Sequence, residues 1–242
     1  MTYKKLSVVW AVAFAVCVSS ANAGILGVVT VEADTGGDTY TAEILIENGP
    51  DPGTKNFTWS LPDPLEIVDG QQNVILTIDN LSVMLDADPV VTANFAVTAG
   101  NFPANVSITT GIASFAALTN PDAAAGASIA FTDGSIPGNG VSGGLTGSNS
   151  GMFIATYNGS STYAQLLGAM STSGFTTGMS SDTGPFSTLA ASVTSIEASF
   201  EFSVTANDSA AGNGRFEVLI PEPSSIALIS LALVGVMVRR RK

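Results

Sequence analysis

The chain has 242 residues, with 20 acidic residues against 8 basic ones, no histidine and a single cysteine, Cys17. Between residues 24 and 220 only Lys55 and Arg215 oppose nineteen carboxylates, a formal charge of −17, and phosphate binding needs clustered cations, so nucleic acid is excluded as a partner. The missing histidine excludes His-based zinc sites, Ser-His-Asp triads and Cys-His pairs.

The N-terminus has the three parts of a secretory signal peptide. Lys4 and Lys5 precede an apolar run over residues 6–18, and the next five residues end in a small-x-small pattern at Ala23. We predict that signal peptidase cleaves between Ala23 and Gly24, which makes residues 1–23 the signal peptide. A retained membrane anchor is the alternative, but the run is shorter than the roughly 20 residues of a spanning helix.

Residues 24–220 are predicted to form a single extracellular β-domain. The clearest strand, 195–205, alternates apolar residues with polar ones, which is the period of a half-buried strand. Asp69-Gly70 and Asp133-Gly134 are among the turn sequences between such segments. We expect an all-β fold, a single β-sandwich of jelly-roll or immunoglobulin-like type, flanked by the signal peptide and a C-terminal transmembrane helix. The expected strands are 25–32, 40–47, 56–61, 73–79, 90–98, 106–110, 128–132, 152–157, 195–205 and 215–220.

Two interior segments lack the strand pattern. Residues 133–151 hold seven glycines, which predicts a long flexible loop, an irregular edge or a linker between two subdomains. Residues 163–170 are the one interior stretch for which we predict a helix.

Acidic and amide side chains offer oxygen ligands that calcium prefers, but at spacings that match no calcium loop. Since Asp and Asn are also ordinary turn residues, we expect no cofactor and keep calcium as an alternative. Glu197 and Glu201 share one strand face about 13 Å apart, too far for a glycosidase pair, so they are predicted to be solvated. The calcium candidates are Asp86 with Asp88, Asp34 with Asp38, and Asn207 and Asp208 with Asn213.

Exposed aromatic side chains are a second recognition device. Tyr40, Phe57 and Trp59 could stack on sugar rings if they face solvent. Strand aromatics usually build cores, so we predict that they are buried.

The C-terminal segment, residues 221–242, has three parts in a fixed order. Pro221, Glu222 and Pro223 form a short extended segment, because the two prolines prevent regular backbone pairing. An apolar run over 226–238 follows, which is short for a hydrocarbon core of about 30 Å. Four cations resist translocation and act as a cytoplasmic stop, which predicts that the domain lies outside the membrane. They are Arg239, Arg240, Arg241 and Lys242.

This arrangement resembles the PEP-CTERM sorting signal, also known as the ice-binding protein C-terminal domain. The resemblance covers only residues 221–242 and carries no indication of ice affinity. It implies recognition of Pro221, Glu222 and Pro223 by an exosortase, a membrane-embedded thiol transpeptidase, followed by release or transfer of the domain to the envelope. It also implies a host that makes extracellular polysaccharide.

These observations predict an exported protein that is first a membrane-anchored precursor and then a cell-surface or extracellular-matrix protein. We expect it to be non-enzymatic and associated with exopolysaccharide or biofilm, with signal peptidase and exosortase as processing partners. A calcium-assisted carbohydrate-binding module is the first alternative. A secreted hydrolase that uses carboxylates alone is the second, since the lack of histidine does not forbid it.

Overall fold

The computed structural model describes residues 28–34, 39–45, 56–86, 89–134, 140–146, 149–172 and 174–219. The predicted signal peptide and the C-terminal segment lie outside these residues, as do Asp38 and Asp88. No helix in the described part of the chain is long and apolar enough to cross a membrane.

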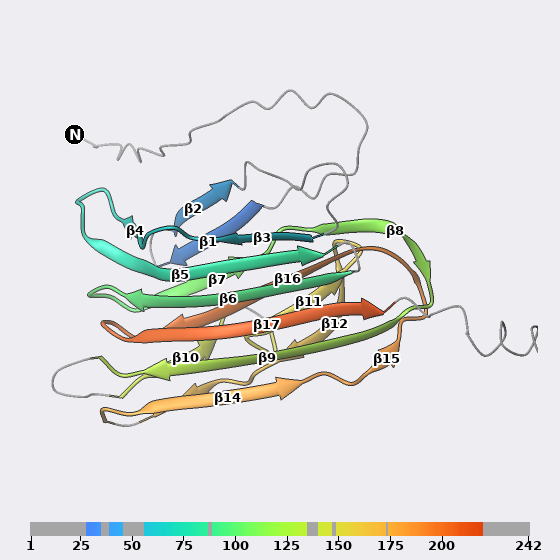
Figure 1. Ribbon diagram of the computed structural model, residues 1–242. Helices are drawn as coiled ribbons and strands as arrows, with labels where there is room; N and C mark the ends of the chain where they lie inside the picture. The colour runs from blue at the N-terminus through green and yellow to red at the C-terminus, as the bar shows by residue number, and fades with distance from the viewer. Residues whose placement is uncertain are drawn as a thin grey trace, which may run out of the picture.

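The described residues form two antiparallel sheets, which confirms the all-β prediction (Figure 1). Sheet A has the order β12-β11-β16-β7-β1-β2, with β8 and β10 also paired to β16 and β13 paired to β10. Sheet B has the order β14-β9-β17-β6-β5-β3, with β15 paired to β9 and β4 paired to β5. The strands are β1 Val28–Asp34, β2 Thr39–Leu45, β3 Asn56–Ser60, β4 Leu65–Val68, β5 Val74–Asp86, β6 Val90–Ala99, β7 Ala104–Thr109, β8 Ala113–Thr119, β9 Asp122–Thr132, β10 Ser142–Leu145, β11 Phe153–Tyr157, β12 Ser161–Leu166, β13 Met170–Ser171, β14 Thr177–Thr183, β15 Ser187–Thr188, β16 Ser192–Val204 and β17 Ser209–Leu219.

Phenylalanines from both sheets meet in the core between them. Phe200 and Phe202 on β16 contact Phe95 on β6 at ring-centroid distances of 4.8 and 5.4 Å. Phe202 also meets Phe131 at 5.7 Å, and Phe200 meets Phe153 at 5.0 Å. Such contacts add about 0.5–1.5 kcal/mol per pair beyond the buried area. The two sheets therefore pack face to face as a sandwich.

Glycines on sheet B and β10 leave room for these rings. A Cβ at Gly214 would lie 2.4 Å from a ring carbon of Phe153, and one at Gly143 would lie 2.2 Å from a ring carbon of Phe131. Since Gly and Ala are weak strand formers, the first halves of β9 and β17 give no strand pattern in the sequence. The predicted strands 128–132 and 215–220 therefore begin earlier, at Asp122 and Ser209.

The helix predicted over residues 163–170 is wrong. Residues Ser161–Leu166 form β12, which pairs with β11, and β13 begins at Met170. Buried Ala164 and Leu166 alternate with half-buried Tyr163 and Gln165, which is the period of a strand.

The glycine-rich segment 133–151 is only partly a loop. It contains β10, which pairs with Phe202–Val204 of β16 in sheet A. The backbone of Gly143 fits here against Phe131, where any side chain would clash.

Strands β7 and β8 pair with successive parts of β16, and a short break after Thr109 separates them. Thr110, which is 1% exposed, donates its N–H to Ala198 O at 2.9 Å and accepts the Ala198 N–H on Oγ1 at 3.1 Å. The hydroxyl thus replaces a main-chain acceptor at the break, and the chain stays attached to β16 on both sides of it.

Candidate functional site

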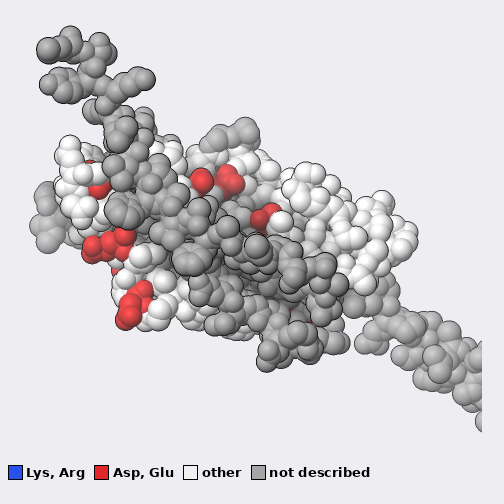
Figure 2. All heavy atoms as spheres, turned by 90° about the horizontal axis from the view of Figure 1, so that it is seen from above, with Lys and Arg blue, Asp and Glu red and all other residues white. Residues whose placement is uncertain are grey.

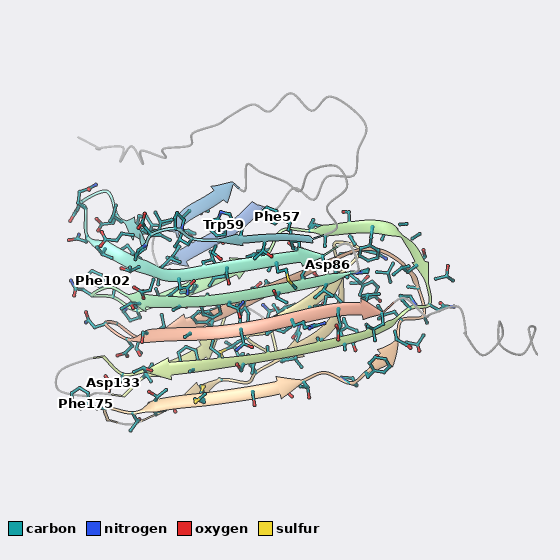
Figure 3. The ribbon with its side chains drawn as sticks, in the orientation of Figure 1. Phe57, Trp59, Asp86, Phe102, Asp133 and Phe175 are labelled. Carbon is teal, nitrogen blue, oxygen red and sulfur yellow. The ribbon has the colours of Figure 1, made fainter. Side chains whose placement is uncertain are left out.

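The expected calcium ligands are not brought together among the described residues. Asn213 lies on the outer face of sheet B and donates to Ser128 Oγ at 2.8 Å. Asp208 lies in the turn between β16 and β17 and is fully buried. Asp86 ends β5, away from Asp133 and the turn that carries Phe175 (Figure 3). No group of three or more His, Cys, Asp or Glu side chains placed to hold a metal occurs in the described part of the chain.

Asp208 and Asp133 instead join the loops at one end of the sandwich. Asp208 Oδ1 accepts the N–H of Gly134 at 3.0 Å, and Oδ2 accepts the Thr205 hydroxyl. Asp133, which is 6% exposed, accepts the N–H of Gly140 at 2.7 Å. Buried carboxylates of this kind are retained because backbone donors satisfy them.

Glu197 and Glu201 have separate surroundings on the outer side of β16. Burial raises the pKa of the Glu197 carboxyl above its ordinary value of 4.5. Glu201 accepts a hydrogen bond from Asn149 Nδ2 at 2.5 Å. Both side chains are half-buried, so the face predicted to be solvated is only partly exposed to solvent.

The aromatic residues proposed for sugar stacking pack into the core, as predicted. Phe57 is 8% exposed, while Trp59 and Tyr40 are partly buried against the core cluster. Phe57 and Trp59 both lie on β3 (Figure 3).

The outer face of sheet B carries a row of hydroxyl and amide side chains that the sequence did not reveal. The strand register aligns one solvent-facing residue from each of six strands, and we name this set the Ser/Asn row. At a strand spacing of about 4.8 Å, six strands span about 24 Å. The Ser/Asn row consists of Ser181, Ser128, Asn213, Asn94, Ser82 and Ser60.

Hydrogen bonds order the amides of the Ser/Asn row. Asn213 Nδ2 donates to Ser128 Oγ at 2.8 Å, and Asn94 Nδ2 donates to Ser82 Oγ at 3.3 Å. A primary amide has two N–H donors and a carbonyl acceptor, so each asparagine keeps capacity for a ligand beyond this one bond.

A shallow hollow of about 320 Å³ overlaps the row at β9, β14 and β17. Gly126, which pairs with Thr183 and Arg215 on the two neighbouring strands, lines the hollow and places no side chain in it. The nearest side-chain atom to a Cβ at Gly126 would be Thr183 Cγ2, 3.5 Å away, so the position has space for a side chain. The lining residues are Gly126, Ala127, Ser128, Ser181, Asp182, Thr183 and Asn213.

The described acidic side chains are scattered over the side of the molecule seen from above (Figure 2). Figure 2 shows the carboxylates there in separate small groups. The Ser/Asn row holds no charged side chain, and the nearby Arg215 guanidinium on sheet B pairs with Glu217.

The remaining predicted site residues lie in the terminal segments. Ala23 and Gly24, the sorting motif Pro221, Glu222 and Pro223, and the basic end Arg239 to Lys242 are outside the described residues. The last described residue, Leu219, ends the central strand β17 and precedes the sorting motif by one residue, Ile220.

These features define a two-sheet, all-β protein whose central strand runs into a C-terminal sorting segment. Residues 219–242 match the family model of the PEP-CTERM protein-sorting motif. The chain therefore carries this motif, which confirms the resemblance and marks the chain as an exported surface protein sorted by an exosortase. No curated protein matches the chain.

Proposed function

We propose that the protein is a non-enzymatic component of the cell surface or extracellular matrix, and that its sandwich associates with exopolysaccharide after sorting. Signal peptidase removes residues 1–23, and the apolar run 226–238 holds the precursor in the membrane. The observation that carries the proposal is the match to the PEP-CTERM family model, which begins at Leu219, the last residue of β17. The sandwich is thus the cargo that the exosortase delivers.

The Ser/Asn row supports the association with exopolysaccharide. Its hydroxyls and amides match the hydrogen-bonding groups of sugar hydroxyls, and the hollow at Gly126 gives a polymer chain a place to lie. The segment's charge of −17 repels polyanions, whereas an uncharged row meets a neutral polymer without that cost. We therefore assign a neutral polysaccharide to this face.

Intact mass spectrometry of protein from the surface and medium fractions of the host tests the sorting. We expect a species that starts at Gly24 and ends between Pro221 and Ser225. A species that still carries Arg239 to Lys242 in all fractions would mean that the tail is a plain membrane anchor.

Retention in the matrix tests the role of sheet B. In the full chain, the double variant Asn94→Ala and Asn213→Ala removes both amides of the Ser/Asn row, and Gly126→Leu fills the hollow. We expect both variants to be processed normally but to lose most of their exopolysaccharide-bound fraction. The control is Asn105→Ala, an exposed asparagine on β7 of sheet A. Equal retention of all variants would exclude this face as the binding surface.

A further inference from the structure

The chain leaves the folded sandwich directly at the sorting motif. Leu219 pairs with Asp122 of β9, and the N–H of Val218 donates to Pro89 O at 2.9 Å. The family match begins at Leu219, so the first matched residue is still part of the sheet. Only Ile220 separates this strand from Pro221.

The tether between the sandwich and the apolar run is short. From Leu219 to Ile226 there are seven residue steps, which span about 25 Å at most in a fully extended chain. The opposite end of β9 lies ten residues, or about 33 Å, beyond Asp122. With residues 226–238 in a bilayer, the end of the sandwich that holds Leu219 is the end that reaches the lipid surface.

That end presents two exposed apolar side chains. Phe186 is 62% exposed and Leu219 is 40% exposed. Thr188 of β15 and Leu219 of β17 both pair with Asp122, so these two strands flank β9 about 10 Å apart. Phe186 precedes β15 by one residue, which places it and Leu219 on the same end of sheet B.

The turn that carries Phe186 is held firmly although its side chain faces solvent. The Tyr163 hydroxyl contacts Pro185 O and, at 2.7 Å, Ala123 O, while the Tyr163 ring stacks on Phe216 at 5.3 Å. On the other side of the turn, the Leu189 N–H donates to Pro121 O at 2.8 Å. The exposure of Phe186 is therefore built into the fold.

We propose that Phe186 and Leu219 are the membrane contact of the unprocessed precursor, and that they rest at the headgroup level of a zwitterionic bilayer. Aromatic side chains favour this level of a membrane. Asp122, whose carboxylate accepts the Thr188 hydroxyl at 2.5 Å, lies between them and disfavours anionic headgroups. The contact holds the sandwich end-on, with residues 220–223 at the interface where a membrane-embedded exosortase acts. This inference rests on the proposed membrane-anchored precursor.

Site-specific labelling of the full precursor tests the contact. In a Cys17→Ser background the chain has no other thiol, so Phe186→Cys can carry a single environment-sensitive fluorophore. Phe175→Cys is the matched control, because Phe175 is also 62% exposed but lies near the far end of β9 (Figure 3). In phosphatidylcholine vesicles with quencher lipids labelled near the headgroup, we expect quenching at position 186 to be at least about twofold stronger than at 175.

Co-flotation of the precursor with the same vesicles distinguishes the proposed membrane anchor from the proposed end-on contact. Flotation with equal quenching at both positions would overturn the end-on contact and leave the anchored precursor standing. A precursor that does not float would overturn the anchored precursor, and the contact with it. Phe186→Ser should still float, and a fluorophore on Ser187→Cys should then lose most of its quenching. Undiminished quenching in that variant would exclude Phe186 as the contact.

Discussion

At the scale of single residues, two glycines allow the sheets to pack closely, and one glutamate is partly buried. Gly214 leaves space for the ring of Phe153, and Gly143 leaves space for the ring of Phe131. The Glu197 side chain on the outer side of β16 is half-buried. Glycine is unfavourable in the interior of a strand. Both positions nevertheless require glycine, because a phenylalanine ring occupies the space that a side chain would fill.

Gly214→Ala is expected to destabilise the sandwich by about 1–3 kcal/mol, as overpacking of a filled core does. Its Cβ would lie 2.4 Å from Phe153 Cε2 and 2.9 Å from Phe200 Cε2, both on fully buried rings. Urea denaturation measures the change in the free energy of unfolding. Gly70→Ala is the control, since no atom lies within 4 Å of its added Cβ. Equal free energies of unfolding for the two variants would mean that the Phe153 and Phe200 rings move aside without a loss of stability.

Glu197→Gln is expected to stabilise the protein at neutral pH. Burial raises the folded-state pKa of Glu197 above 4.5, so between 4.5 and the raised value the folded state binds more protons than the unfolded state. Stability therefore falls as pH rises through this window, and the cost remains above it. Melting temperatures from pH 3 to pH 8 should show a gain for the variant near pH 7 that vanishes below about 4.5. A constant gain at all pH values would contradict desolvation as its cause.

At the scale of elements, polar side chains join segments that the main-chain ladder leaves apart. Asp208 attaches the turn after β16 to Gly134, and Asp133 closes the segment up to Gly140. The sequence marks these residues as turn formers but not as buried acceptors, because their partners are up to 74 residues away. Each of the ten expected strands corresponds to an observed one, but β4, β8, β10 and β12 to β15 were not expected. The Ala-rich half of β9 was hidden because alanine and glycine are weak strand formers.

Thr110→Val is expected to cost about 1–3 kcal/mol, because it preserves the side-chain shape but leaves the buried Ala198 N–H without its acceptor. Thr110→Ser, which restores the hydroxyl, should recover most of the loss. Thr109→Val is the neighbouring control, since Thr109 is half-buried on the other side of the strand. Thermal unfolding of the three variants measures the differences. A loss in Thr110→Ser as large as in Thr110→Val would assign the effect to packing rather than to the hydrogen bond.

At the scale of the whole molecule, the sequence by itself determined the β class, the C-terminal sorting motif and the surplus of negative charge. These properties follow from the order of residues along the chain. They need only the alternation within each strand, the sequence of motif, apolar run and cations, and the number of charges. Only the tertiary structure decided which strands share a sheet, and hence that six distant Ser and Asn residues form one row. It also decided that Phe186 lies beside the exit of the chain at Leu219. Both arrangements depend on strand register between segments far apart in sequence, which alternation within a single strand does not encode.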